Sequence, residues 1–181
     1  MKKLVISLGM ASTFVTGSTL AYDGTINFTG KVVDSTCVVK TGNDNLNVIL
    51  PTVAASTLVH DGATTGLTRF EIKLENCAAN VNGATGVKAY FEPSSNIDYA
   101  THTLKNTASG SKATNVNIQL ADGSNPATTL NIGENNGDQR SVAIPVTAGE
   151  VTLPYYAQYY ATGRATAGAV ASTINYTVAY E

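Results

Sequence analysis

The sequence has 181 residues, of which 43% are hydrophobic and only 13% are charged, with a formal net charge of −2 at pH 7. Binding to nucleic acid or to an anionic membrane by charge requires clustered cations, and this composition argues against both kinds of partner. The length predicts a single domain with a core of its own.

The first predicted element is a cleaved secretory signal peptide over residues 1–21. Lys2 and Lys3 form a basic start, Leu4–Val15 an apolar stretch, and residues 19–21 a small-residue cleavage site. The apolar stretch is shorter than the about 20 residues of a membrane-spanning helix, and a buried N-terminal helix is the alternative interpretation. The 11 basic residues less these two lysines leave nine against 13 acidic residues, so the mature chain carries a net charge near −4.

Residues 22–36 form a predicted N-terminal extension that contains a strand-like stretch, TINFTGKVV. One face of this stretch carries Ile26, Phe28, Gly30 and Val32. A chain start frays unless another element holds it, so a strand here must join a sheet. Gly30 packs nothing in an ordinary strand, which favours a place where another backbone approaches closely.

Cys37 and Cys77 are the two cysteines of the chain. An exported protein with an even number of cysteines is expected to form disulfides, so the sequence predicts a Cys37–Cys77 bridge. Closing a loop of this length stabilises the fold by ~4 kcal/mol in the chain-entropy model. Metal binding is disfavoured because no histidine stands at ligand spacing from either cysteine.

Alternating apolar and polar residues predict four further β-strands. Their sequences are TRFEIKLENC (68–77), GVKAYFEP (86–93), NVNIQLADG (115–123) and EVTLPYYAQYY (150–160). Turn-forming stretches rich in Asn, Gly and Ser separate them, and no amphipathic helix pattern interrupts them. This pattern predicts an all-β, antiparallel sandwich.

The last predicted strand, residues 168–180, alternates along its whole length. One face carries Gly168, Val170, Ser172, Ile174, Tyr176, Val178 and Tyr180. The opposite face is small or polar, so the bulky face is expected to lie on the core. No later stretch of the sequence is expected to cover the free edge of this strand.

The order of these features resembles the fimbrial subunits of the bacterial chaperone–usher pathway, in the type 1 pilin-like group. The features are the signal peptide, the arm INFTGKVV before Cys37, the second cysteine in KLENC and the ending INYTVAYE. The family pattern also has a penultimate tyrosine and a glycine fourteenth from the end, which match Tyr180 and Gly168. The resemblance implies an incomplete immunoglobulin-like β-sandwich that lacks its last strand, with residues 37–181 as the pilin domain.

The resemblance also implies a mechanism, in which the arm of one subunit fills the groove of another. The implied donor strand consists of Ile26, Phe28, Gly30 and Val32. The implied acceptor groove and chaperone contact consist of Gly168, Val170, Ile174, Tyr176, Val178 and Tyr180. The implied partners are other copies of the chain, a periplasmic chaperone and an outer-membrane usher, with a host or surface receptor left open.

The predicted function is that of a structural subunit that polymerises head to tail in a cell-surface fimbria and supports adhesion and biofilm formation. Two alternatives stay open: a minor or adaptor subunit with receptor-binding loops, and a monomeric secreted sandwich that is completed by its own arm. No enzyme, cofactor or metal is predicted, because His60 and His102 belong to no catalytic or metal-binding motif.

Overall fold

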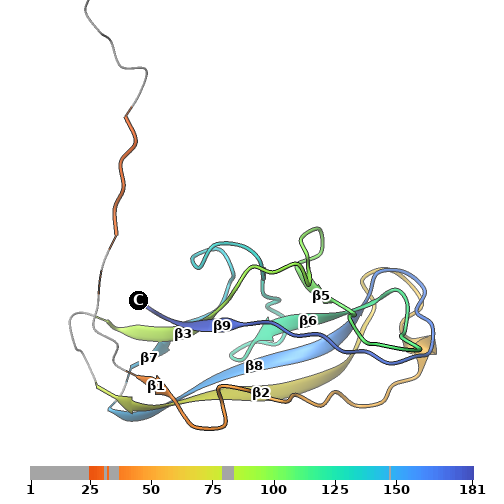
Figure 1. The fold of residues 1–181 in the computed structure, drawn as a ribbon, viewed down its shortest axis with the longest axis horizontal. Coiled ribbons are helices and arrows are strands. Elements are labelled where there is room, and N and C mark those ends of the chain that lie inside the picture. The colour runs from red at the N-terminus through yellow and green to blue at the C-terminus, as the bar shows by residue number, and fades with distance from the viewer. Residues whose placement is uncertain (1–24, 31, 33–36, 79–83, 147) are drawn as a thin grey trace, which may run out of the picture. The chain divides into compact units, whose positions relative to one another are not determined.

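The computed structural model describes residues 25–30, 32, 37–78, 84–146 and 148–181 (Figure 1). The chain divides into two compact units, Met1–Lys31 and Val32–Glu181. The predicted signal peptide and its cleavage site lie outside the described residues. Within the first unit, residues 25–30 have no regular secondary structure, and the side chains of Ile26 and Phe28 are 77% and 89% exposed.

The described part of the second unit consists of β-strands and one short 3-10 helix, η1 (Ala55–Thr57). The strands are β1 (Val38–Val39), β2 (Thr64–Cys77), β3 (Gly86–Phe91), β4 (Ile97–Asp98), β5 (Thr103–Lys105), β6 (Val116–Asp122), β7 (Ile144–Pro145), β8 (Gly149–Ala161) and β9 (Tyr176–Tyr180). Strands β2, β3, β6 and β8 coincide with the four alternating stretches, so these predictions are confirmed.

The strands form two antiparallel sheets. The larger sheet has the order β1-β2-β8-β6-β5-β4, and the smaller has the order β7-β3-β9. Figure 1 shows β8 between β2 and β6, and β9 beside β3. The predicted antiparallel, all-β architecture is therefore confirmed.

The core lies between the inward faces of the two sheets. In β8, Val151, Leu153, Tyr155 and Ala157 are buried, because alternate residues of a strand point to the same side. The ring of Tyr155 packs edge-on against Phe91 of β3, with 5.2 Å between the ring centroids. Such contacts across the two sheets make one continuous hydrophobic cluster.

The predicted disulfide is confirmed. Cys37 bonds to Cys77 across a sequence separation of 40 residues. Cys37 directly precedes β1 and Cys77 ends β2, and these two strands are paired. The bridge thus attaches the start of the second unit's sheet to its longest strand.

The last strand is shorter than the sequence predicts. Only Tyr176–Tyr180 pair with β3, although alternate burial continues back to Val170. The reason is the end of the partner: β3 stops at Phe91, and Pro93, which has no N–H to donate, follows two residues later. The carbonyl of Ala171 instead accepts a hydrogen bond from the backbone N–H of Thr107.

Candidate functional site

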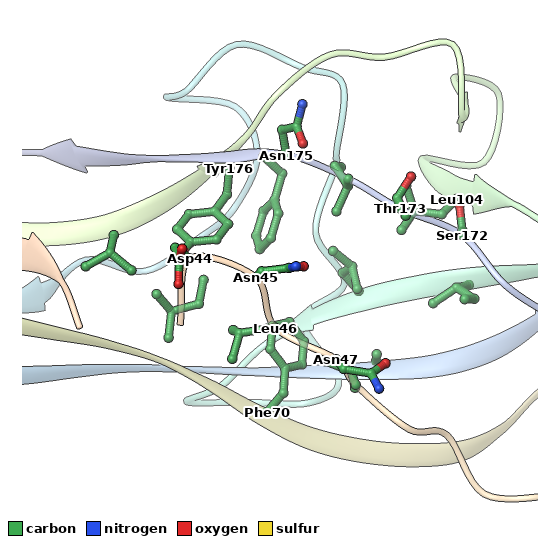
Figure 2. Close-up of a pocket in the computed structure, with 18 of the residues that line it drawn as sticks. Asp44, Asn45, Leu46, Asn47, Phe70, Leu104, Ser172, Thr173, Asn175 and Tyr176 are labelled. Carbon is green, nitrogen blue, oxygen red and sulfur yellow. The ribbon is translucent and has the colours of Figure 1, made fainter. Parts of the chain in front are cut away.

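An open groove of about 880 Å³ lies between the two sheets, alongside β9 (Figure 2). It is lined by Val39, Asp44, Asn45, Leu46, Asn47, Val48, Leu50, Phe70, Ile72, Phe91, Leu104, Ile118, Leu120, Ala157, Ser172, Thr173, Ile174, Asn175, Tyr176 and Val178. Most of these side chains are aliphatic or aromatic, and the others carry amide or hydroxyl groups or, at Asp44, a carboxylate. This chemistry suits an apolar ligand with a polar backbone.

Two segments of the chain form the walls of the groove. Residues 44–50 form one wall, and residues 172–178, including the start of β9, form the other. Figure 2 shows Tyr176 pointing from the β9 side toward Asp44 and Asn45. Phe70 of β2 and Ile118 of β6 contribute to the floor.

The walls run antiparallel and are joined beyond both ends of the groove. Hydrogen bonds connect three residue pairs in opposite chain order: Tyr180 with Cys37, Tyr176 with Asn43, and Ala165 with Leu58. The groove is therefore a bounded, elongated site rather than an open plane.

The groove exposes part of the hydrophobic core. Nine partly buried hydrophobic residues pack against the main core cluster, and seven of them line the groove. These seven are Val39, Leu50, Phe70, Ile118, Ile174, Tyr176 and Val178. A contiguous exposed apolar surface of this kind marks a binding site or an aggregation hazard.

The backbone of β9 is also incomplete on this side. Gly86 and Glu181 exchange reciprocal backbone hydrogen bonds, with N–O distances of 3.3 and 2.9 Å. In an antiparallel ladder, hydrogen-bonded and non-bonded residue pairs alternate. The backbone N–H and C=O groups of Ala179 and Thr177 therefore also point toward β3. Those of the even-numbered residues point the other way, toward the groove. Among the described residues, no strand pairs with this edge of β9, which leaves it open to an added strand.

The six predicted acceptor residues fall into three places. Ile174, Tyr176 and Val178 line the groove, half-buried, while their neighbours Thr173 and Asn175 are exposed. This alternation confirms that the even-numbered residues share one face in this stretch.

The other three predicted residues lie beyond the groove. Gly168 and Val170 line a second pocket of about 280 Å³, next to the buried Leu58 and Ala113. The hydroxyl of Tyr180 accepts a hydrogen bond from the backbone N–H of Cys37 at 3.1 Å and donates to the carbonyl of the same residue at 3.3 Å. The predicted set therefore spans the groove and both of its ends.

Tyr176 makes the corresponding contact in the groove itself. Its hydroxyl donates to the carbonyl of Asn43 at 2.8 Å. Burial raises the pKa of Tyr176 above its ordinary value, and the negative charge of Asp44 adds to this increase. The hydroxyl is thus kept protonated and able to donate.

Sequence reasoning missed the wall formed by residues 44–50. The start of this wall has the composition of a turn, and residues 41–45 form turns and a bend. The signal beyond the turn is the alternation of Leu46, Val48 and Leu50, all of which line the groove. Ile49, which is 80% exposed, interrupts this pattern.

The groove has the chemistry of a peptide-binding site. An open strand edge supplies main-chain hydrogen bonds, and alternate apolar positions supply pockets for side chains. Within the described ranges, no three His, Cys, Asp or Glu residues come together as a metal site, and no helix there is both long and apolar enough to cross a membrane.

Sequence comparisons relate the chain to fimbrial proteins. The family model described as type-1 fimbrial protein, A, matches residues 50–181. The F17 fimbrial protein of Escherichia coli is 50% identical over 184 residues, covering 100% of both chains. The major fimbrial subunit SMF-1 of Stenotrophomonas maltophilia is 43% identical over 164 residues, covering 88% of this chain and 94% of that protein.

Solved structures show the same fold. A chaperone–usher pilus structure superimposes with a TM-score of 0.61 at 19% identity, covering 94% of this chain and 100% of the other. An antigen and type I fimbria protein of Burkholderia pseudomallei gives a TM-score of 0.55 at 33% identity, covering 87% and 97% of the two chains. The predicted incomplete immunoglobulin-like sandwich agrees with these neighbours.

Proposed function

Because the chain belongs to the type-1 fimbrial protein family, we propose that the arm of one copy completes the sandwich of the next by lying in the groove beside β9. The chain is a structural subunit of a cell-surface fimbria. Polymerisation by strand donation agrees with the chaperone–usher fold of its structural neighbours. The proposal assigns the two surfaces through which subunits join.

One observation carries this proposal: the sandwich has an open strand edge directly above an exposed part of its core. The edge of β9 offers N–H and C=O groups, and Ile174 and Val178 offer apolar surface beneath it. A single added strand would satisfy both at once. A small-molecule site would need no such unpaired edge.

The N-terminal arm has the properties of the strand that is required. Ile26, Phe28 and Val32 are 77%, 89% and 97% exposed in their own chain. Burying each of these side chains would contribute about 2 kcal/mol, before the cost of ordering the arm. Gly30, between Phe28 and Val32, lets backbone or a bulky side chain approach closely.

The arm and the groove also match in length. Four alternate positions from Ile26 to Val32 span about 20 Å at the rise of an extended strand. Four alternate positions on the groove wall, from Ser172 to Val178, span the same distance. The four donor positions therefore match the groove-lining stretch of this wall in length.

This contact is heterologous, since the arm and the groove are different surfaces of the same chain. Repeating it joins subunits head to tail and gives an open filament, not a closed ring. The Stenotrophomonas relative carries the name major fimbrial subunit, which supports a shaft role over a minor or adaptor role. In that role the chain serves adhesion and biofilm formation without catalysis.

An exposed groove must be covered before assembly, because apolar surface of this kind promotes aggregation. We infer that a periplasmic chaperone covers it during export and that an outer-membrane usher exchanges the chaperone for the next arm. Gly168, Val170, Ile174, Tyr176, Val178 and Tyr180 are the residues that we expect to contact both the chaperone and the donor arm.

The test replaces one residue on each face of the arm. Phe28→Arg places a charge on the donor face, whereas Thr29→Arg places the same charge on the opposite face. We expect cells that express Phe28→Arg to export a folded, disulfide-bonded subunit but to show no filaments by electron microscopy, and Thr29→Arg to assemble. Normal filaments from Phe28→Arg would overturn the role of the arm.

A further inference from the structure

Two tyrosines of β9 reach the opposite side of the sandwich, Tyr176 within the groove and Tyr180 beyond its end. The Tyr176 hydroxyl donates to the carbonyl of Asn43 at 2.8 Å. The Tyr180 hydroxyl donates to the carbonyl of Cys37 at 3.3 Å and accepts from its N–H at 3.1 Å. Both tyrosines belong to the three-stranded sheet, while Cys37 and Asn43 flank β1 of the six-stranded sheet.

The partners of these tyrosines are held firmly in place. Cys37 is bonded to Cys77 at the end of β2. The side-chain carbonyl oxygen of Asn43 accepts a hydrogen bond from the backbone N–H of Lys73 in β2 at 3.0 Å. Each tyrosine therefore connects β9 to a point that is fixed on β2.

Closure of an empty apolar groove is thermodynamically favoured. Bringing its walls together removes apolar surface from water, and this is favourable by roughly 25 cal/mol per Å². A closed groove would have no room for a donor strand. A subunit that remains ready to accept an arm needs something that keeps its walls apart.

We infer that Tyr176 and Tyr180 are positioning residues that hold the empty groove at the width of a strand. This inference rests on the proposed function. A tyrosine ring is rigid and has only two side-chain torsions, so a ring fixed at β9 and bonded at its hydroxyl acts as a spacer between the walls. Once the donor lies in the groove, the donor itself keeps the walls apart.

This role has a kinetic signature. Loss of the hydroxyl contacts slows the uptake of a donor, because the groove must first reopen. It leaves release of the donor unchanged, because the filled groove cannot close. A merely structural role would instead lower the stability of the empty and filled forms together.

The experiment uses the mature chain with Phe28→Arg, which keeps the acceptor monomeric, and a fluorescent peptide of residues 23–34 as donor. Uptake and release rates are measured for this acceptor and for the same acceptor with Tyr176→Phe and Tyr180→Phe. Tyr99→Phe is the matched control, since its hydroxyl donates to the carbonyl of Ser94 at 3.3 Å and Tyr99 does not line the groove.

We expect the double variant to take up peptide about tenfold more slowly, since three neutral hydrogen bonds are lost. The release rate should be unchanged, and Tyr99→Phe should have no effect. If the double variant does not fold, Tyr176→Phe alone is expected to slow uptake by about threefold. Unchanged or faster uptake, or faster release, would overturn the inference while the proposed function stands. Failure of the acceptor with both tyrosines to bind the peptide would instead overturn the proposed function, and the inference with it.

Discussion

The hydroxyl of Tyr155 accepts a hydrogen bond from the backbone N–H of Ala89 at 2.9 Å, inside the core. Tyr155 lies on β8 of the larger sheet and Ala89 on β3 of the smaller sheet, and both residues are almost fully buried. The hydroxyl of Ser141 lies 2.9 Å from the same oxygen. The Tyr155 hydroxyl thus connects the two layers inside the core.

Tyr155→Phe should destabilise the subunit. The ring packing against Phe91 is kept, but the buried N–H of Ala89 loses its acceptor, which costs about 1–3 kcal/mol. Urea denaturation of the monomeric Phe28→Arg chain, with and without this substitution, measures the difference in the free energy of unfolding. Tyr99→Phe, at an exposed site, should change it by less than about 0.5 kcal/mol. Equal effects of the two substitutions would contradict the role of the Tyr155 link.

The same tyrosine predicts a loss of stability at alkaline pH. Burial raises the pKa of Tyr155 above its ordinary value near 10. The native state therefore holds this proton more tightly than the unfolded state does, so the contribution to stability is complete below about pH 10 and falls as the pH rises through the native pKa. In urea titrations between pH 9 and pH 11, the stability deficit of Tyr155→Phe should shrink as the pH rises. A constant deficit would contradict the raised pKa.

Much of the fold follows from the period-two pattern of the sequence. The alternation in residues 150–160 predicts β8 and its buried face because Val151, Leu153 and Tyr155 must share a side of any extended strand. The extent of the last strand does not follow, because it depends on where its partner β3 ends. Alternate burial continues back to Val170 even though pairing with β3 stops at Tyr176.

Only one wall of the candidate site could be predicted from the sequence. The alternation of Ile174, Tyr176 and Val178 with polar residues predicts that they share one face, and the structure places them in the groove. The opposite wall could not be predicted, because Leu46 and Val48 follow a turn. They line the groove only because the fold brings them beside β9. The contacts from Tyr176 and Tyr180 to backbone carbonyls leave no sequence signature at all.

The disulfide should matter for folding rather than for the surface of the subunit. Cys37 and Cys77 are both buried and close a loop across the β1–β2 pair. Replacing both by serine removes the constraint on the unfolded chain and should cost ~4 kcal/mol. The amount of folded subunit recovered after export should fall severalfold, as measured by protease-resistant protein. An undiminished yield would show that the core alone suffices.

Substituting alanine for Gly168 and for Gly30 should affect different properties, the stability of the subunit in one case and its assembly in the other. A β-carbon on Gly168 would lie 2.3 Å from the backbone nitrogen of Ala113 and 2.4 Å from the carbonyl carbon of Lys112. This backbone must move to accommodate it, so Gly168→Ala should lower the free energy of unfolding by about 1–3 kcal/mol. A β-carbon on Gly30 would meet nothing within 4 Å in its own chain.

Gly30→Ala should therefore leave the unfolding of the isolated subunit unchanged within about 0.5 kcal/mol, yet slow filament growth, since the crowding arises only inside the groove of the next subunit. Urea denaturation of the monomeric Phe28→Arg chain and filament growth from subunits with an otherwise native arm separate the two effects.

If Gly30→Ala assembles at the normal rate, no close approach occurs at this position of the arm. If instead it destabilises the monomer as much as Gly168→Ala does, the arm already packs within its own subunit, and strand donation between copies is the wrong mechanism.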